Sequence, residues 1–165
     1  MTATTADSPN AAAALRGNGR QLCTCRVGEL LLGIDVLIIQ EVLHHSEVTE
    51  IPRTSPAIAG LINLRGQIAT AIDLRVRLGV ERTEGSDVVQ IVVRHHGEPV
   101  SLLVDEIGDV MTVDIDIFEP PPETITGVAR DIVTGAYKLE DELLLTFDVD
   151  RAISASNSQT EGSAR

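Results

Sequence analysis

The sequence predicts a mainly β protein whose sheets are built from many short antiparallel strands. Short apolar runs recur along the chain, and Gly, Pro and Asp residues separate them, which is the pattern of strands joined by turns. Aromatic residues make up only 2% of the chain, so the core must be aliphatic, and β-branched aliphatic residues favour strands. The apolar runs that predict strands are residues 22–27, 30–34, 42–44, 61–64, 68–72, 88–93, 100–104, 125–128, 132–139 and 143–147.

Turn residues between these runs predict hairpins and a few short helices. Gly and acidic residues favour tight connections between antiparallel strands. The predicted hairpin turns are residues 28–29, 65–66, 96–98 and 140–142. Ser55 is expected to cap a helical turn that begins at Pro56 and closes at Gly60. Asp73 is expected to cap a second helical turn, which ends near Gly79.

An internal duplication is indicated by four markers that occur in the same order in both halves of the chain. They are Asp35, Pro52, Gly60 and Asp73 in the first half, and Asp105, Pro120, Gly127 and Asp148 in the second. Two separations agree closely, at 52−35=17 against 120−105=15 and at 60−52=8 against 127−120=7. The third, at 73−60=13 against 148−127=21, requires an insertion. Short motifs also agree by chance, but the common order predicts two related small barrels, whose closed sheets have no free edges.

Length and charge limit the protein classes to which the chain can belong. A chain of 165 residues with 43% hydrophobic residues suits one domain, or two small subdomains that share a core. The net charge of −12 and the scarcity of aromatic residues argue against nucleic acid, whose phosphates repel acidic surfaces and whose bases stack on aromatic rings. The sequence has no signal-peptide pattern and no apolar run of about 18 residues. We therefore expect a cytoplasmic protein without direct membrane insertion.

The cysteines and histidines offer little support for a metal site. Cys23 and Cys25 lie on one face of a predicted strand, but the second pair of a structural zinc site is missing, so two inert thiols are favoured over a redox or metal role. The four histidines form two adjacent pairs, at 44–45 and 95–96. Neighbouring strand residues point to opposite faces, and neither pair has an obvious carboxylate partner. We expect exposed loop histidines, no bound metal and no cofactor.

A turn at residues 63–66, Asn-Leu-Arg-Gly, joins two strand-like runs and presents the guanidinium of Arg65 at a fixed place on a sheet, which indicates recognition. In order and spacing, this turn and its flanking segments resemble the CheW family, the adaptors that couple chemoreceptors to the CheA histidine kinase. The segments that carry the resemblance are residues 33–42, 50–62, 63–75 and 104–110, within a region of about 21–153.

The resemblance implies two SH3-like, five-stranded antiparallel β-barrel subdomains with a few short helices. The implied CheW-like domain spans residues 20–154, as two intertwined barrel subdomains with approximate halves 20–86 and 87–154, between disordered tails at 1–19 and 155–165. It also implies a non-enzymatic chemotaxis adaptor that needs no cofactor. The implied partners are the cytoplasmic tip of chemoreceptors and the regulatory domain of a CheA-type histidine kinase, in membrane-associated receptor arrays.

The resemblance further implies a receptor-binding groove between the two barrels. The positions that match this groove are Ile39, Glu41, Gly60 and Arg65 in the first half and Ile107 and Val110 in the second. A structural alternative exists for Glu41 and Arg65, namely an ion pair that braces the first barrel by about 0–1 kcal/mol. The aliphatic residues could equally belong to the core. Ser101, where relatives often carry Gly, is expected near the groove, where it would affect the choice of partner.

Two other functions stay open from the sequence. An adaptor of a pilus-linked or other alternative chemosensory pathway would have the same fold and the same groove. A small metalloprotein or hydrolase would use Cys23, Cys25 and the histidines, although the motifs of serine hydrolases, phosphate-binding loops and zinc proteases are not found in the sequence.

Overall fold

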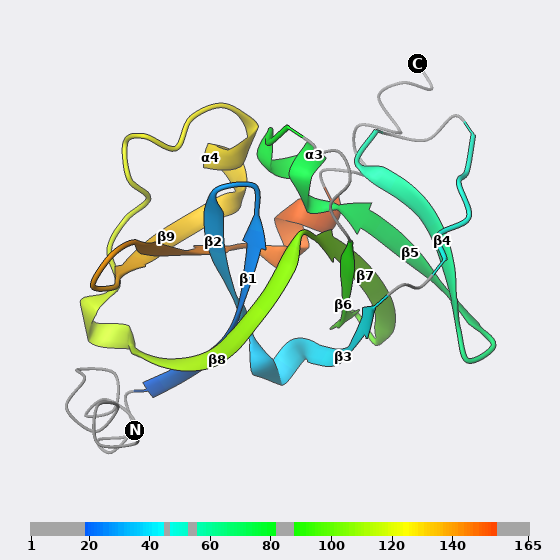
Figure 1. Cartoon of the computed structure of the whole chain (residues 1–165), viewed down its shortest axis with the longest axis horizontal. Coiled ribbons are helices and arrows are strands. Elements are labelled where there is room, and N and C mark those ends of the chain that lie inside the picture. Colours follow the sequence, from blue (N-terminus) through cyan, green and yellow to red (C-terminus); the bar gives the residue numbers. More distant parts are fainter. Residues whose placement is uncertain (1–18, 45–46, 53–55, 82–87, 155–165) are drawn as a thin grey trace.

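The structure, a computed structural model, describes residues 19–44, 47–52, 56–81 and 88–154. Within these residues, ten strands form two five-stranded sheets, which confirms the predicted fold class (Figure 1). Short helices join the strands: η1 (Val36–Ile38), α3 (Leu74–Leu78), η2 (Ile115–Ile117), α4 (Val128–Ile132) and a helical segment at 149–154. In this described part, no helix has the length and apolar character to cross a membrane. The predicted tails fall outside it, except for residue 19.

One barrel, which we call the terminal barrel, combines strands from both ends of the described chain. In spatial order its strands are β8 (Glu106–Asp114), β1 (Gly19–Val27), β2 (Leu30–Asp35), β10 (Leu143–Phe147) and β9 (Val133–Lys138). An isolated bridge between Glu119 and Ala136 links the chain that follows β8 to β9, at the opposite edge of the sheet. This bridge closes the barrel.

The other barrel, which we call the middle barrel, uses the middle of the chain. In spatial order its strands are β3 (Ile39–His44), β6 (Val89–His95), β7 (Glu98–Val104), β5 (Gln67–Asp73) and β4 (Ile58–Leu64). A bridge between Thr49 and Leu61 links the chain that follows β3 to β4 and closes this barrel in the same way.

The two barrels have the same strand order. Strands β3, β4, β5, β6 and β7 occupy the places of β8, β9, β10, β1 and β2, respectively, and each sheet has one parallel pair, β5 with β7 and β10 with β2. The two barrels do not coincide with the halves 20–86 and 87–154, because each half supplies strands to both barrels, which are intertwined. The reason is that β1 and β2 pair with β8 and β10 from the far end of the chain.

One of the four duplication markers was aligned incorrectly. The counterpart of Gly60 is Gly135 and not Gly127, because a side chain at Gly60 would collide with the carbonyl of Thr49 and one at Gly135 with the carbonyl of Glu119, the two closing bridges. With this alignment the third separation agrees, at 73−60=13 against 148−135=13, and the second becomes 60−52=8 against 135−120=15, so the insertion lies between Pro120 and Gly135. The inserted residues precede β9 and include α4, which Gly127 caps at its N-terminus.

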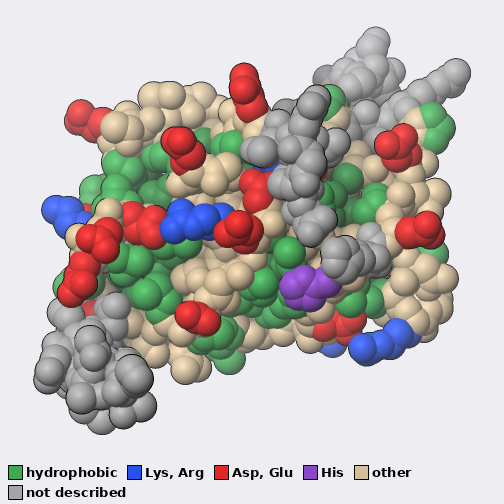
Figure 2. All heavy atoms as spheres, in the orientation of Figure 1, with side chains coloured by type: hydrophobic (Ala, Val, Ile, Leu, Met, Phe, Trp, Pro, Cys, Tyr) green, Lys and Arg blue, Asp and Glu red, His purple; other side chains and the backbone are tan. Residues whose placement is uncertain are grey.

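The core is aliphatic, as predicted. Its largest cluster lies between the barrels and takes residues from both sheets, for example Leu32 and Ile34 from the terminal barrel and Ile91 and Leu102 from the middle barrel. Two smaller clusters belong to single barrels. The barrels therefore share the core between them, and each keeps a smaller core of its own. On the face shown in Figure 2, acidic side chains are scattered widely, in keeping with the net charge of −12.

The local predictions have mixed outcomes. All four hairpin turns are found, and Asp73 caps α3, which ends at the left-handed Gly79. The helical turn expected from Pro56 to Gly60 is wrong, because β4 begins at residue 58 and Gly60 must stay extended to approach the bridge; its proposed cap, Ser55, lies outside the described residues. Strand β8 was not predicted, and residues 125–128, predicted as a strand, lead into α4.

Candidate functional site

Arg65 occupies a tight two-residue turn between β4 and β5. The turn is of the type that requires positive φ at both central residues, and Arg65 and Gly66 have φ values of 55° and 89°. Asn63 stabilises the turn, because its Oδ1 accepts a hydrogen bond of 2.8 Å from the backbone N–H of Gly66. The sequence Asn-Leu-Arg-Gly thus holds the base of the arginine side chain in a defined position.

Glu41 and Arg65 form an ion pair, with 3.2 Å between Arg65 Nη2 and Glu41 Oε2. The pair joins β3 to the β4–β5 turn, which are brought together because the barrel closes. The arginine side chain is 81% exposed and the glutamate side chain only 17%. Glu41 therefore fixes one edge of the guanidinium while most of Arg65 remains open to a partner. Such a pair stabilises the fold by only about 0–1 kcal/mol.

Ile107 and Val110 lie on the face of β8 that is directed toward the middle barrel. They pair with Cys25 and Cys23 of β1, which are two residues apart and so share one face of the sheet. A bulge at Gly108 and Asp109 produces this arrangement, because in a regular strand residues three apart would point to opposite faces.

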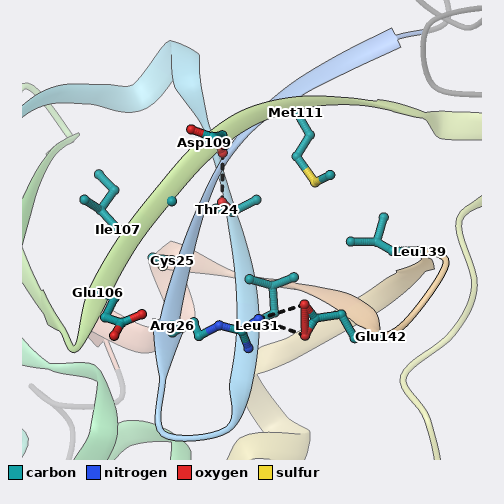
Figure 3. Close-up of a pocket in the computed structure, with 11 residues that line it drawn as sticks. Thr24, Cys25, Arg26, Leu31, Glu106, Ile107, Asp109, Met111, Leu139 and Glu142 are labelled. Carbon is teal, nitrogen blue, oxygen red and sulfur yellow. Dashed lines mark hydrogen bonds and ion pairs between the residues drawn. The ribbon is translucent and has the colours of Figure 1, made fainter. Parts of the chain in front are cut away.

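Ile107 packs against the core cluster between the barrels, and 55% of Val110 is exposed. In Figure 3, Ile107 lies on one side of β8, and Met111 and Leu139 lie on the other. We call the boundary between the two barrels, where the largest core cluster lies, the seam. The exposed Val110 thus extends an apolar strip that begins at this buried boundary.

Ile39 reaches the same seam from the middle barrel. It pairs with Val93 and packs against the cluster between the barrels. A register shift then separates it from Glu41, which pairs with Val92 of the middle barrel's own core. Among the six predicted site residues, Ile39, Ile107 and Val110 therefore border the seam. Glu41 and Arg65 lie together elsewhere, on β3 and the β4–β5 turn of the middle barrel.

Two residues expected at the groove have internal roles. Gly60 faces the carbonyl of Thr49 at the closing bridge, so the close approach of two backbone segments explains why it is glycine. Ser101 is fully buried, and its hydroxyl donates a 2.9 Å hydrogen bond to Gln90 Oε1. The expectation that Ser101 lies near the groove is wrong, because its strand position points into the middle barrel.

A pocket of about 310 Å³ opens in the terminal barrel and was not predicted (Figure 3). Leu31, Met111 and Leu139 are among the apolar residues that line it. At its rim, Arg26 Nη2 donates to both carboxylate oxygens of Glu142, at 2.7 and 3.0 Å. These two residues are 116 positions apart, so no local sequence signal could have revealed the pair.

The cysteines are buried free thiols, whereas one histidine pair has a carboxylate beside it that was not expected. Cys23 and Cys25 are buried free thiols, and burial, with a smaller effect from Cys23, raises the pKa of Cys25 to about 12. Burial also raises the pKa of Cys23, so both thiols stay protonated at neutral pH. The expectation that the histidine pairs lack a carboxylate partner is wrong at residues 95–96, because Asp150 lies beside both rings.

Comparison with known proteins gives consistent results. Residues 21–157 match the CheW-like domain. The chain is 30% identical over 138 residues to the chemotaxis protein CheW of Klebsiella aerogenes, with 83% of each chain covered. Its structure matches that of the scaffolding protein TtCheW from Thermoanaerobacter tengcongensis with a TM-score of 0.74 and 31% identity, covering 81% of this chain and 92% of the other. The protein PilI of Pseudomonas aeruginosa is more distant, at 24% identity over 65% of this chain and 61% of PilI.

Proposed function

The chain belongs to the CheW family of chemotaxis adaptors, and we propose that it couples the cytoplasmic tips of chemoreceptors to a CheA-type histidine kinase without catalysing a reaction. It would work in the cytoplasm at membrane-associated receptor arrays. The more distant similarity to PilI does not favour the alternative of a pilus-linked pathway.

The exposed guanidinium of Arg65 is the observation that best supports a partner-binding face. Arginine is among the residues that contribute most to protein interfaces, since its planar group forms several hydrogen bonds and packs over apolar surface. Here the backbone turn and Glu41 restrict the side chain before a partner arrives, which lowers the entropy lost on binding. A receptor helix of mixed polar and apolar character suits this arrangement.

The apolar strip at the seam supports an extension of this face across both barrels. Val110 is exposed, and Ile39 and Ile107 border the shared core next to it. A helix that contacts Arg65 on one barrel and Val110 on the other would bind only while the barrels keep their relative position. The affinity for the receptor would thus depend on how the two barrels are placed relative to each other.

The kinase regulatory domain requires a second surface if both partners bind at once. Exposed apolar residues gather at one end of the terminal barrel, where Ile115, Ile117 and Phe118 are 49%, 41% and 43% exposed. Apolar side chains of this size in one short segment are typical of a protein contact. We assign this end to the kinase.

Charge reversal at Arg65 tests the receptor part of the proposal. Arg65→Glu should weaken binding of a chemoreceptor cytoplasmic fragment about 30-fold, which is roughly 2 kcal/mol, and leave kinase binding unchanged. The matched control is Arg94→Glu, which makes the same change of charge at another exposed arginine. Both variants should melt within a few degrees of the wild type, because exposed charges change stability by less than about 0.5 kcal/mol. Wild-type receptor affinity in Arg65→Glu would show that this arginine is structural.

A further inference from the structure

Three metal-ligating side chains converge where the β6–β7 turn meets the C-terminal helical segment. His95 Nε2 lies 2.7 Å from Asp150 Oδ1, and His96 Nε2 lies 4.0 Å from the same oxygen. The two imidazole rings are in edge contact, with centroids 4.1 Å apart. One possible ligand atom from each of the three residues lies within 4.8 Å of the other two.

The backbone explains how adjacent histidines reach the same carboxylate. His95 ends β6, whereas His96 is the first residue of a two-residue turn and has a φ of 52°. The left-handed conformation redirects the His96 side chain, so the rule that neighbouring strand residues point to opposite faces does not apply here.

Both elements that carry the ligands are well anchored. His95 is only 15% exposed and belongs to a strand that is paired on both sides. Asp150 lies in a helical segment whose Ala152 and Ile153 are buried, and whose first turn is capped by a 3.1 Å hydrogen bond from the Arg151 N–H to Asp148 Oδ1. The backbone at His95 and Asp150 is therefore held by the fold, and His96 follows directly in the β6–β7 turn.

The pair of His95 and Asp150 is the tightest contact of the cluster. His95 Nε2 is shielded from solvent, and Asp150 Oδ1, 2.7 Å away, forms an ion pair with it when the imidazole is protonated. A cation bound to both atoms would satisfy the nitrogen lone pair and the carboxylate charge together.

We propose that His95, His96 and Asp150 bind one transition metal ion of the zinc type. Two imidazole nitrogens and one carboxylate oxygen suit zinc, nickel or copper, whereas calcium and magnesium prefer oxygen ligands. Ligand atoms bound tetrahedrally to zinc at about 2.0–2.2 Å lie about 3.3 Å apart, and the observed 2.7 and 4.0 Å are on either side of that value. His96 and Asp150 are exposed, so small side-chain movements adjust the geometry and water takes the fourth position. The ion fastens the C-terminal segment to the β6–β7 turn.

Calorimetric titration of the tag-free full chain with ZnCl₂ tests the site. The wild type should bind one zinc ion per chain, and both His96→Ala and Asp150→Asn should reduce the affinity at least tenfold. The matched control, His44→Ala, removes an exposed histidine at the end of β3 and should bind like the wild type. Zinc should also raise the melting temperature of the wild type and of His44→Ala, but not that of His96→Ala.

Cobalt distinguishes this site from the cysteines. Co²⁺ bound to His95, His96 and Asp150 should show ligand-field bands without the thiolate charge-transfer absorption that ligation by Cys23 or Cys25 would produce. Thiolate absorption would overturn the proposal, and so would an affinity for zinc in His96→Ala equal to that of the wild type.

Discussion

The substitution Arg75→Met tests whether a buried charge network holds the two barrels together. Arg75 is 2% exposed in α3 of the middle barrel, and its Nη1 lies 3.0 Å from Asp105 Oδ1 at the point where the chain crosses into the terminal barrel. Asp105 Oδ2 in turn accepts a 2.6 Å hydrogen bond from the N–H of Gly28, in the β1–β2 turn. The network therefore connects both barrels through one guanidinium, which also lies 3.4 Å from Asp73.

The expected loss of stability depends on the hydrogen bonds that Asp73 and Asp105 keep in the variant. Removal of one partner from a buried ion pair typically destabilises a protein by about 3–5 kcal/mol, because the other charge stays buried without compensation. In Arg75→Met, Asp73 still accepts from the backbone N–H of residue 75, and Asp105 still accepts from Gly28. These remaining bonds place the expected value near the lower limit, at about 3 kcal/mol, or about 10 °C in melting temperature for a domain of this size.

Equilibrium unfolding in urea, followed by circular dichroism, measures this loss. Arg94→Met is the control, since it removes an exposed arginine and should change the unfolding free energy by less than about 0.5 kcal/mol. Asp105→Asn in the Arg75→Met background removes the uncompensated charge and keeps an acceptor for Gly28, so the double variant should be more stable than Arg75→Met alone. A loss of less than about 1 kcal/mol in Arg75→Met, or a double variant that is less stable still, would refute this reasoning.

Three further predictions concern the core, the strip at the seam and the duplication. Burial raises the pKa of Cys25 from 9.0 to about 12, so this thiol alone should cost the wild type about 1.4 kcal/mol of stability per pH unit between pH 9 and 12, where the unfolded thiol ionises first; urea unfolding of Cys25→Ala should show a smaller slope, because Cys23, whose pKa is also raised, remains. Val110→Asp should keep the wild-type melting temperature and lose receptor binding, and retained binding would exclude β8 from the receptor face. Gly60→Ala and Gly135→Ala should each destabilise the protein by about 1–3 kcal/mol in urea unfolding, because a backbone carbonyl blocks the added methyl group, and wild-type stability in either variant would contradict the equivalence of the two positions.

Features encoded by a few neighbouring residues were predictable from the sequence. Three of the hairpin turns follow from a glycine that adopts positive φ, and the start of α3 follows from the carboxylate of Asp73, which accepts from the N–H of Arg75 at 2.9 Å. The aliphatic core follows from composition alone. Each of these depends on the local chemistry of the chain, which the sequence states directly.

Features that depend on distant partners were not predictable in the same way. Strand β8 mixes polar and apolar residues, and only two of its nine residues are buried, because it lies at an edge of its sheet, so it lacks the apolar pattern of a buried strand. The parallel pairing of β2 with β10 joins segments about a hundred residues apart and follows from barrel closure. The proximity of His95, His96 and Asp150 likewise requires the C-terminal segment to return to the β6–β7 turn.

The candidate site depends on the same distant pairing, through the bulge in β8. A side chain at Gly108 would collide with Oγ1 of Thr24, and that hydroxyl donates a 2.8 Å hydrogen bond to the carbonyl of Asp109. Thr24 and the small size of Gly108 therefore hold the extra residue in place, and the extra residue turns Ile107 and Val110 to the same face. In sequence, these two residues follow no strand periodicity that would assign them to a common surface. The resemblance to the family could name both positions, but only the pairing of β8 with β1 explains why they share one face.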